Sequence, residues 1–235
     1  MKTPLILAHR GMSHLACENT LEAFELTVQH KVDGIEFDIH LTKDQKLVVV
    51  HDHNLMRLAK VDQVVEQLTL KELQKLEVST QYGKGKIPQL KDVFERFGTK
   101  LFYDIELKSE TSKNGNFEQL VFEEIKKYKI ENHCIVSSFN PFVMRKFNKV
   151  SKRTIPSAII YDDDPSVPPL LRKGWGRFIC KADFLKPNYQ LIDKKTLKKG
   201  YPIITWTVDD VEVGRQLLAK GVVALISNQP NIFFS

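Results

Sequence analysis

The sequence predicts an α/β protein folded as a (β/α)8 TIM barrel with a small insertion after the second strand. Short apolar, β-rich runs alternate with stretches of helical length, a pattern typical of a parallel sheet covered by helices. Eight strand candidates fit into 235 residues, close to the length of one barrel. A competing open sheet would carry a glycine-rich phosphate loop after its first strand. None follows it here, and Gly83 and Gly85 have the spacing of a turn.

Each predicted element comes from one run of residues. The eight predicted strands are Leu5–Ala8, Gly34–Ile39, Lys100–Ile105, Cys134–Ser137, Thr154–Ile160, Ala182–Leu185, Ile203–Thr207 and Val222–Ile226. The predicted helices between them include Thr20–His30, Phe117–Tyr128, Phe142–Asn148 and Val211–Lys220. Gly221 follows the last of these, at a position where glycine commonly ends a helix.

One segment interrupts this alternation. We expect a single domain over residues 1–235, with residues 52–89 as a small insertion that folds over the barrel mouth. Within it, Val64–Leu68 has the composition of a short β-like piece. Thr69 and Glu72 have the spacing of a capping box and predict a short helix.

The composition is that of a globular protein with a buried core, with 42% hydrophobic and 27% charged residues. The three cysteines, Cys17, Cys134 and Cys180, are few and odd in number, so they do not indicate a disulfide framework. Their sparseness favours a reducing compartment. The apolar run at the N-terminus is too short for a signal-peptide core, and no later run is long enough to cross a bilayer. We therefore expect a soluble, cytoplasmic protein without a membrane span.

The net charge bears on the partners that the chain can bind. Lys and Arg total 35 against 29 Asp and Glu, a net charge of +6 that suits an anionic substrate. Net charge by itself informs on solubility and steering rather than on a reaction. No basic patch with interleaved aromatic residues indicates nucleic acid, so the expected partner is a small molecule. The oligomeric state stays open.

Three acidic residues stand near the ends of the second and third predicted strands. Glu36 and Asp38 are two residues apart on one strand, so their side chains point to the same side, and Glu106 joins them from the next strand. The carboxyl ends of parallel barrel strands meet on one rim. Crowded carboxylates repel one another unless a cation lies among them, and ligand sets made of oxygen favour Mg²⁺ or Ca²⁺. We predict one such divalent cation here.

Two histidines and two basic residues belong to the same rim. His9 ends the first strand and His51 ends a later strand-like run, so they are the candidate general acid and base. Arg10 and Lys108 add positive charge that can bind phosphate oxygens. Metal carboxylates, cations for an anion and two histidines together indicate phosphoryl transfer. The remaining histidines, His14, His30, His40, His53 and His133, lack this placement and receive no role.

Taken together, these strings resemble the glycerophosphodiester phosphodiesterase family. The matching strings are His9-Arg10-Gly11, Glu18-Asn19-Thr20-Leu21, Ala23-Phe24, Gly34-Ile35-Glu36-Phe37-Asp38, Leu41-Thr42-Lys43-Asp44, His51-Asp52, Ile87-Pro88-Gln89-Leu90, Ile105-Glu106-Leu107-Lys108, Ser137-Ser138-Phe139, Thr205-Trp206-Thr207-Val208 and Gly221. The resemblance covers nearly the whole chain, and its early strings are the most specific.

The resemblance implies an enzyme that hydrolyses glycerophosphodiesters to sn-glycerol 3-phosphate and an alcohol. It implies Glu36, Asp38 and Glu106 as metal ligands and the two histidines as the acid/base pair. Arg10 and Lys108 would contact the phosphate. The implied route uses the glycerol hydroxyl of the substrate as nucleophile and passes through a cyclic phosphate.

Some positions depart from the family pattern. Cys17 stands where the family usually has proline, as small filler or as an oxidisable thiol beside the site. Val223 and Asn228 replace two aspartates in the closing string, which puts the last loop in question. Trp206 is expected to line the substrate cleft, with a role in the barrel core as the alternative.

Two other functions fit the same residues. A phospholipase D-like phosphodiesterase acting on lysophospholipids would share the histidines and the carboxylates, but it would need an apolar tunnel or a membrane-facing loop. A non-catalytic phospho-ligand binder should have lost a histidine or a metal carboxylate, and all are present. The alcohol headgroup and the choice between Mg²⁺ and Ca²⁺ are not encoded in a recognisable motif.

Overall fold

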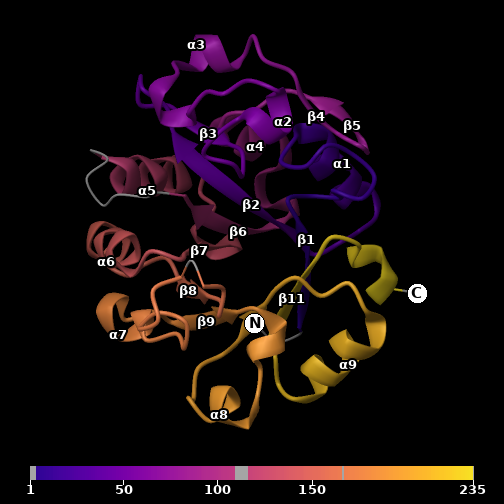
Figure 1. The fold of residues 1–235 in the computed structure, drawn as a ribbon, viewed down its shortest axis with the longest axis vertical. Helices are drawn as coiled ribbons and strands as arrows, with labels where there is room; N and C mark the ends of the chain where they lie inside the picture. Colours follow the sequence, from indigo (N-terminus) through magenta and orange to yellow (C-terminus); the bar gives the residue numbers. More distant parts are fainter. Residues whose placement is uncertain (1–3, 109–115, 166, 235) are drawn as a thin grey trace.

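The computed structural model describes residues 4–108, 116–165 and 167–234. Within these ranges, eight parallel strands run in the order β10-β11-β1-β2-β6-β7-β8-β9, with helices around them (Figure 1). The strands are β1 (Leu5–His9), β2 (Gly34–Leu41), β6 (Phe102–Leu107), β7 (Cys134–Ser138), β8 (Ser157–Tyr161), β9 (Phe184–Pro187), β10 (Ile204–Thr205) and β11 (Ala224–Ser227).

The two ends of this sheet meet. Isolated parallel bridges join Leu185 to Ile203 and Asn188 to Trp206, between β9 and β10. The first strand β1 pairs in parallel with the last strand β11, so the N-terminal and C-terminal parts of the chain lie side by side. The predicted (β/α)8 TIM barrel is therefore confirmed.

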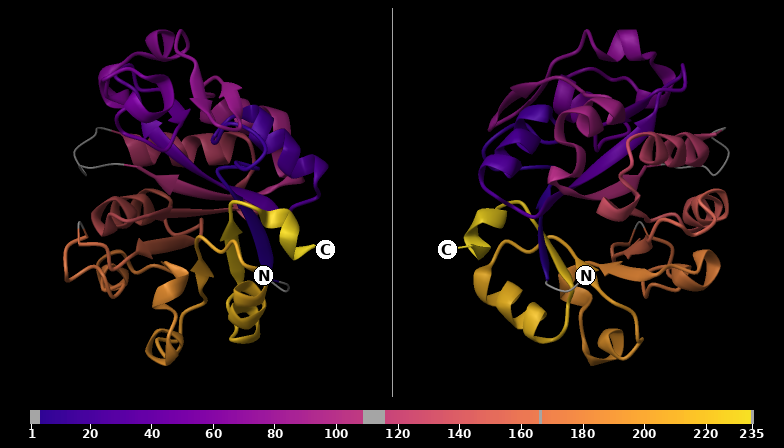
Figure 2. Two further views of the ribbon diagram at one scale, coloured as in Figure 1. Left: turned by 45° about the vertical axis from the view of Figure 1, so that its right-hand side comes forward. Right: turned by 180° about the vertical axis from the view of Figure 1, so that it is seen from behind.

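Helices cover the outside of the barrel, as Figure 2 shows from two further sides. They are α1 (Leu21–Gln29), α4 (Leu90–Phe97), α5 (Phe117–Lys127), α6 (Pro141–Val150), α7 (Gly176–Cys180), α8 (Lys194–Leu197) and α9 (Val211–Ala219), with 3-10 turns η2 (Gly98–Lys100), η3 (Glu131–His133), η4 (Tyr189–Leu191) and η5 (Pro230–Phe233). The four helices predicted from the sequence are confirmed. Thr20 and Asp210 cap α1 and α9 through their side-chain oxygens.

Several predicted strand bounds are wrong by a few residues. β2 continues to Leu41 because β3 (Leu47–Val49) pairs with its end as an antiparallel hairpin. β6 begins only at Phe102, since η2 occupies the residues before it, and it continues through Glu106. The predicted strands over 154–160 and 182–185 are shifted towards the C-terminus in the same way. Apolar runs mark strands, but the partner strand decides where pairing begins.

The segment after β3 forms a separate layer, drawn at the top of Figure 1. It contains α2 (Met56–Ala59), η1 (Val65–Gln67), α3 (Leu70–Leu73), β4 (Val78–Thr80) and β5 (Gly83–Gly85). The capping box of Thr69 and Glu72 is confirmed. The β-like piece predicted over 64–68 is wrong, because a 3-10 turn forms there, and the predicted glycine turn is a strand paired with β4.

Apolar side chains bind this layer to the barrel. Val48 and Val50, which flank the end of β3, pack in one buried cluster with residues such as Leu55, Leu58 and Val65. We propose that residues 52–89 are an insertion within a single domain spanning 1–235. The described part of that domain excludes residues 1–3, 109–115, 166 and 235.

The barrel interior changes from apolar to polar along the strands. Leu7, Ile135, Ala158, Ile204, Ala224 and Ile226 form one fully buried apolar cluster. Two residues further along β1 and β7 lie His9 and Ser137, which face the same side of their strands. The polar residues therefore lie towards the carboxyl ends of the strands. No helix of the described residues has the length and apolar composition needed to cross a bilayer. Cys17, Cys134 and Cys180 are buried free thiols.

Candidate active site

Strand register brings the predicted acidic residues together. His9 on β1 stands beside Glu36 on β2, and Asp38 stands beside Glu106 on β6. One carboxylate oxygen from each of Glu36, Asp38 and Glu106 lies within 4.8 Å of the other two. Their residues are 2%, 1% and 6% exposed, so water screens this negative charge poorly.

Burial and crowding change the protonation of two of these groups. Burial raises the pKa of Glu36 to about 8; Lys186 opposes this shift, and neighbouring carboxylates such as Asp38 reinforce it. Burial would also raise the pKa of Asp38, but Lys108 and Arg10 outweigh it and hold that pKa well below its usual range. Asn19 adds a hydrogen bond from Nδ2 to Asp38 Oδ2 at 3.0 Å.

Arg10 and Lys108, the predicted phosphate contacts, both form ion pairs with the acidic residues. Lys108 Nζ lies 3.1 Å from Asp38 Oδ1 and 2.5 Å from Glu106 Oε1. Arg10 Nε lies 3.5 Å from Asp38 Oδ2, while its Nη1 donates to Glu18 Oε1 at 2.8 Å. The rim therefore combines positive and negative groups within contact distance.

A divalent cation fits this group of carboxylates. Glu36 Oε2 is a buried oxygen for which the described residues provide no hydrogen-bond partner. A buried, unpaired carboxylate oxygen is costly, and a hard cation would satisfy it. The donor set consists of oxygens alone, which suits Mg²⁺ and Ca²⁺ better than softer ions.

His9 is held by the loop that follows β11. Its Nδ1 lies 2.7 Å from Asn228 Oδ1, and Asn228 Nδ2 donates to Asp209 Oδ2 at 2.8 Å. Because the amide nitrogen faces Asp209, the amide oxygen accepts and His9 Nδ1 carries the proton. Burial, followed by the charge of Arg10, lowers the pKa of His9 to about 4. The ring is then neutral near pH 7, with its acceptor nitrogen Nε2 3.8 Å from Glu36 Oε2.

His51 follows the hairpin of β2 and β3, two residues beyond the end of β3. Val50 N donates to Asp38 O at 3.0 Å, which places the next residue beside the acidic strand. His51 Nδ1 donates to Asp52 Oδ1 at 2.7 Å, and Arg57 Nε donates to Asp52 Oδ2 at 2.6 Å. His51 lines a cleft together with Glu106 and Lys108. Its Nε2 is the ring nitrogen that Asp52 leaves available.

The predicted aromatic residue Trp206 packs against Phe139. Trp206 Nε1 donates to the carbonyl of Lys186 at 3.1 Å, and its ring meets the ring of Phe139 edge to face with centroids 5.7 Å apart. Phe139 lines the cleft beside Lys108. Trp206 is therefore in direct contact with Phe139, a residue that lines the cleft.

Sequence reasoning missed a buried ion pair beneath the rim. Lys186, on β9, reaches across the barrel to Asp104 Oδ2 at 2.9 Å and to Glu36 Oε1 at 3.5 Å. It also donates to Ser137 Oγ at 3.1 Å. Carboxylates, with Asp104 first, raise its pKa despite burial, so it stays charged. The available signal was a lysine inside an apolar run, Phe184–Pro187.

Comparison with known proteins agrees with this arrangement. The family model described as "Glycerophosphoryl diester phosphodiesterase family" matches residues 9–232. A glycerophosphodiester phosphodiesterase of Caldanaerobacter subterraneus subsp. tengcongensis is 33% identical over 98% of this chain and 96% of its own. The human lysophospholipase D GDPD1 is 35% identical over 61% of this chain and 48% of its own.

A solved structure shares the whole fold. The glycerophosphodiester phosphodiesterase of Thermotoga maritima superposes with a TM-score of 0.78 at 27% identity, covering 100% of this chain and 98% of that one. The family match begins at His9, the last residue of β1, and includes the other rim residues. The chain therefore belongs to the glycerophosphoryl diester phosphodiesterase family, whose members are phosphoric diester hydrolases.

Proposed function

We propose that this protein hydrolyses glycerophosphodiesters to sn-glycerol 3-phosphate and an alcohol with the help of one divalent cation. The observation that carries the proposal is the group of three carboxylates within 4.8 Å, flanked by His9 and by the cleft that holds His51. Family membership supports the substrate class. Mg²⁺ and Ca²⁺ both suit the oxygen ligands.

We assign Glu36, Asp38 and Glu106 as the ligands of this cation. When bound, it would neutralise charge on the phosphoryl oxygens of the substrate. Arg10 and Lys108 would bind the same oxygens, because a planar guanidinium and an ammonium both suit phosphate. Trp206 would hold Phe139 against the bound substrate.

The two histidines would move the protons. His9 presents the free lone pair of Nε2 and would accept the proton of the glycerol hydroxyl, whose oxygen attacks phosphorus. The bond from phosphorus to the alcohol then breaks, and His51 protonates the departing oxygen. Asp52, next to His51 Nδ1, can stabilise the imidazolium that this role requires. A cyclic phosphate results.

The second half of the reaction reverses the roles. Water adds to phosphorus in the cyclic phosphate and gives a proton to His51. The bond from phosphorus to the glycerol oxygen that attacked earlier breaks, and His9 returns a proton to that oxygen. Both histidines regain their starting states. Holding the substrate hydroxyl in line with phosphorus provides much of the rate advantage.

The experiment measures sn-glycerol 3-phosphate released from several glycerophosphodiesters, with and without a chelator. We expect the chelator to abolish release, and His9→Ala or His51→Ala to lower kcat/KM by about 100-fold to 10,000-fold. His30→Ala, at an exposed histidine after α1, is the matched control. Full activity in either catalytic variant would remove the acid/base assignment.

A second substrate class belongs in the same experiment. The human relative named lysophospholipase D motivates a lysophospholipid arm. Most residues that line the cleft are polar or charged, with Leu107 and Phe139 as the exceptions, and we expect the smaller glycerophosphodiester to be the better substrate. A higher kcat/KM for lysophosphatidylcholine than for glycerophosphocholine would reverse this preference.

A further inference from the structure

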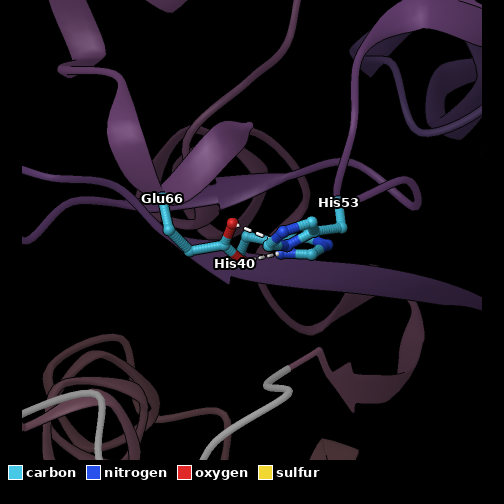
Figure 3. A group of neighbouring side chains, drawn as sticks. All are labelled: His40, His53 and Glu66. Atoms are coloured by element: carbon cyan, nitrogen blue, oxygen red, sulfur yellow. Dashed lines mark hydrogen bonds and ion pairs between the residues drawn. The ribbon is translucent and has the colours of Figure 1, made fainter. Parts of the chain in front are cut away.

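A second group of metal-binding side chains lies beside the first. His40 comes from β2, two residues beyond Asp38, while His53 and Glu66 come from the segment after β3. Figure 3 shows the two imidazole rings on one side of the Glu66 carboxylate. One ligand atom from each residue lies within 4.8 Å of the other two. Neither histidine has a role predicted from the sequence.

The contacts of His40 require a proton or a metal ion beside its ring. Its Nε2 lies 3.2 Å from the carbonyl oxygen of His51, which can only accept, so Nε2 carries a proton. In the neutral ring Nδ1 then bears a lone pair, yet it lies 2.7 Å from Glu66 Oε1, another acceptor. Two acceptors at this distance repel one another unless a proton or a metal ion lies between them.

His53 lies in the same way against the other oxygen of the Glu66 carboxylate. Its Nδ1 lies 2.8 Å from Glu66 Oε2. Both atoms are buried, and their alignment does not form a hydrogen bond to each other or to any described residue. The two oxygens of the Glu66 carboxylate thus face two imidazole nitrogens. A single extra proton on His40 would satisfy Oε1 but would leave Oε2 and His53 Nδ1 without a hydrogen bond.

The donor types select a different ion from the first group. Two imidazole nitrogens and one carboxylate oxygen favour Zn²⁺ and similar transition ions, whereas Mg²⁺ and Ca²⁺ prefer oxygens alone. His40, His53 and Glu66 also line the cleft that holds His51 and Lys108, so an ion has a route from solvent.

We propose that His40, His53 and Glu66 form a second metal site, selective for Zn²⁺ or a similar transition ion, that ties the segment after β3 to the barrel. An ion on His40 Nδ1 would fix the ring whose Nε2–H donates to the His51 carbonyl. Such a hydrogen bond from a ligating histidine to a carbonyl orients the ligand. The site would thereby hold the backbone of His51 in place, and its existence does not depend on the reaction proposed above.

Co²⁺ binding, followed by visible absorption, tests this site directly. Metal-free protein is saturated with Mg²⁺ to fill the oxygen site and then titrated with Co²⁺, whose visible absorption identifies nitrogen ligands in a low-coordinate geometry. We expect one equivalent of Co²⁺ to bind, Zn²⁺ to displace it, and Zn²⁺ to raise Tm. His53→Ala and Glu66→Gln should each weaken binding by more than about 100-fold, since loss of a supporting contact alone costs 10-fold to 100-fold.

Two controls separate this site from the rest of the molecule. His30→Ala removes an exposed histidine and should leave Co²⁺ binding unchanged, as should Glu36→Gln, which removes a ligand of the oxygen site. The His53 side chain is 38% exposed, so its removal should not unfold the protein, and circular dichroism checks this. Equal Co²⁺ affinity in wild type, His53→Ala and Glu66→Gln, or no absorption band in wild type, would overturn the proposal.

Discussion

At the scale of single residues, the orientation of His9 depends on one amide. The family pattern has aspartate where this chain has Asn228, and the sequence alone left the consequence open. The structure shows that Asn228 still accepts from His9 Nδ1, because Asp209 receives the other end of the amide. The acceptor for His9 is therefore a neutral amide oxygen in this chain.

We predict that Asn228→Ala lowers kcat/KM about fivefold. Loss of one neutral hydrogen bond costs roughly 1 kcal/mol, which corresponds to about that factor in rate. Steady-state kinetics of glycerophosphodiester hydrolysis measures it, with Asn132→Ala at an exposed asparagine as the control. Unchanged kinetics in Asn228→Ala would mean that His9 is oriented by other contacts.

At the scale of elements, Arg57 on α2 links the inserted segment to the loop after β1. Its guanidinium donates to Glu18 Oε1 and Oε2 at 2.8 Å each, and to Asp52. Burial would raise the pKa of Glu18, but hydrogen bonds from Arg57 and charge from Arg10 outweigh it and lower that pKa. The link is therefore electrostatic and depends on pH.

We predict that Arg57→Met reduces the free energy of unfolding by about 1 kcal/mol at pH 7, a small value because the Arg57 side chain is 49% exposed. The pKa of Glu18 is lower in the folded than in the unfolded protein. The stabilisation is thus complete above the unfolded pKa of about 4.3 and is lost as pH falls through the folded pKa.

Urea unfolding of wild type and Arg57→Met from about pH 7 down to about pH 3 measures this dependence. The gap between the two curves should be widest near neutrality and narrow below about pH 4. Arg96→Met, which removes an exposed ion pair with Glu25, is the matched control. A gap that stays constant across this range contradicts the prediction.

At the scale of the whole molecule, the barrel brings like charges close together. Glu36, Asp38, Asp104 and Glu106 share one end of the interior, and Lys108 and Lys186 are their nearest ammonium groups. A ligand that binds the folded barrel and not the unfolded chain stabilises the fold.

We predict that Mg²⁺ or Ca²⁺ at about a hundredfold excess over Kd stabilises the protein by about 2.7 kcal/mol. For a domain of this size, that raises Tm by roughly 5–10 °C. Thermal scans with chelator and with each ion measure the shift. Asp38→Asn should lose it, whereas Asp62→Asn, on an exposed loop, should keep it. An equal shift in both variants would exclude Asp38 as a ligand.

The sequence by itself determined the barrel, four of its helices and the rim residues. Alternating apolar runs and helical stretches encode a parallel sheet locally, and strand-end motifs such as Glu36 and Asp38 are contiguous in the chain. Strand bounds were less certain, because pairing with β3 and the start of η2 depend on partners distant along the sequence.

Only the tertiary structure decided which distant side chains meet. Lys186 and Asp104 pair across the interior, 82 positions apart by subtraction of their numbers, and no local pattern connects them. His40, His53 and Glu66 form no local motif, and they meet only because a turn in the inserted segment brings the Glu66 carboxylate against both rings. Local periodicity specifies elements, whereas charge pairing across a core depends on how those elements pack.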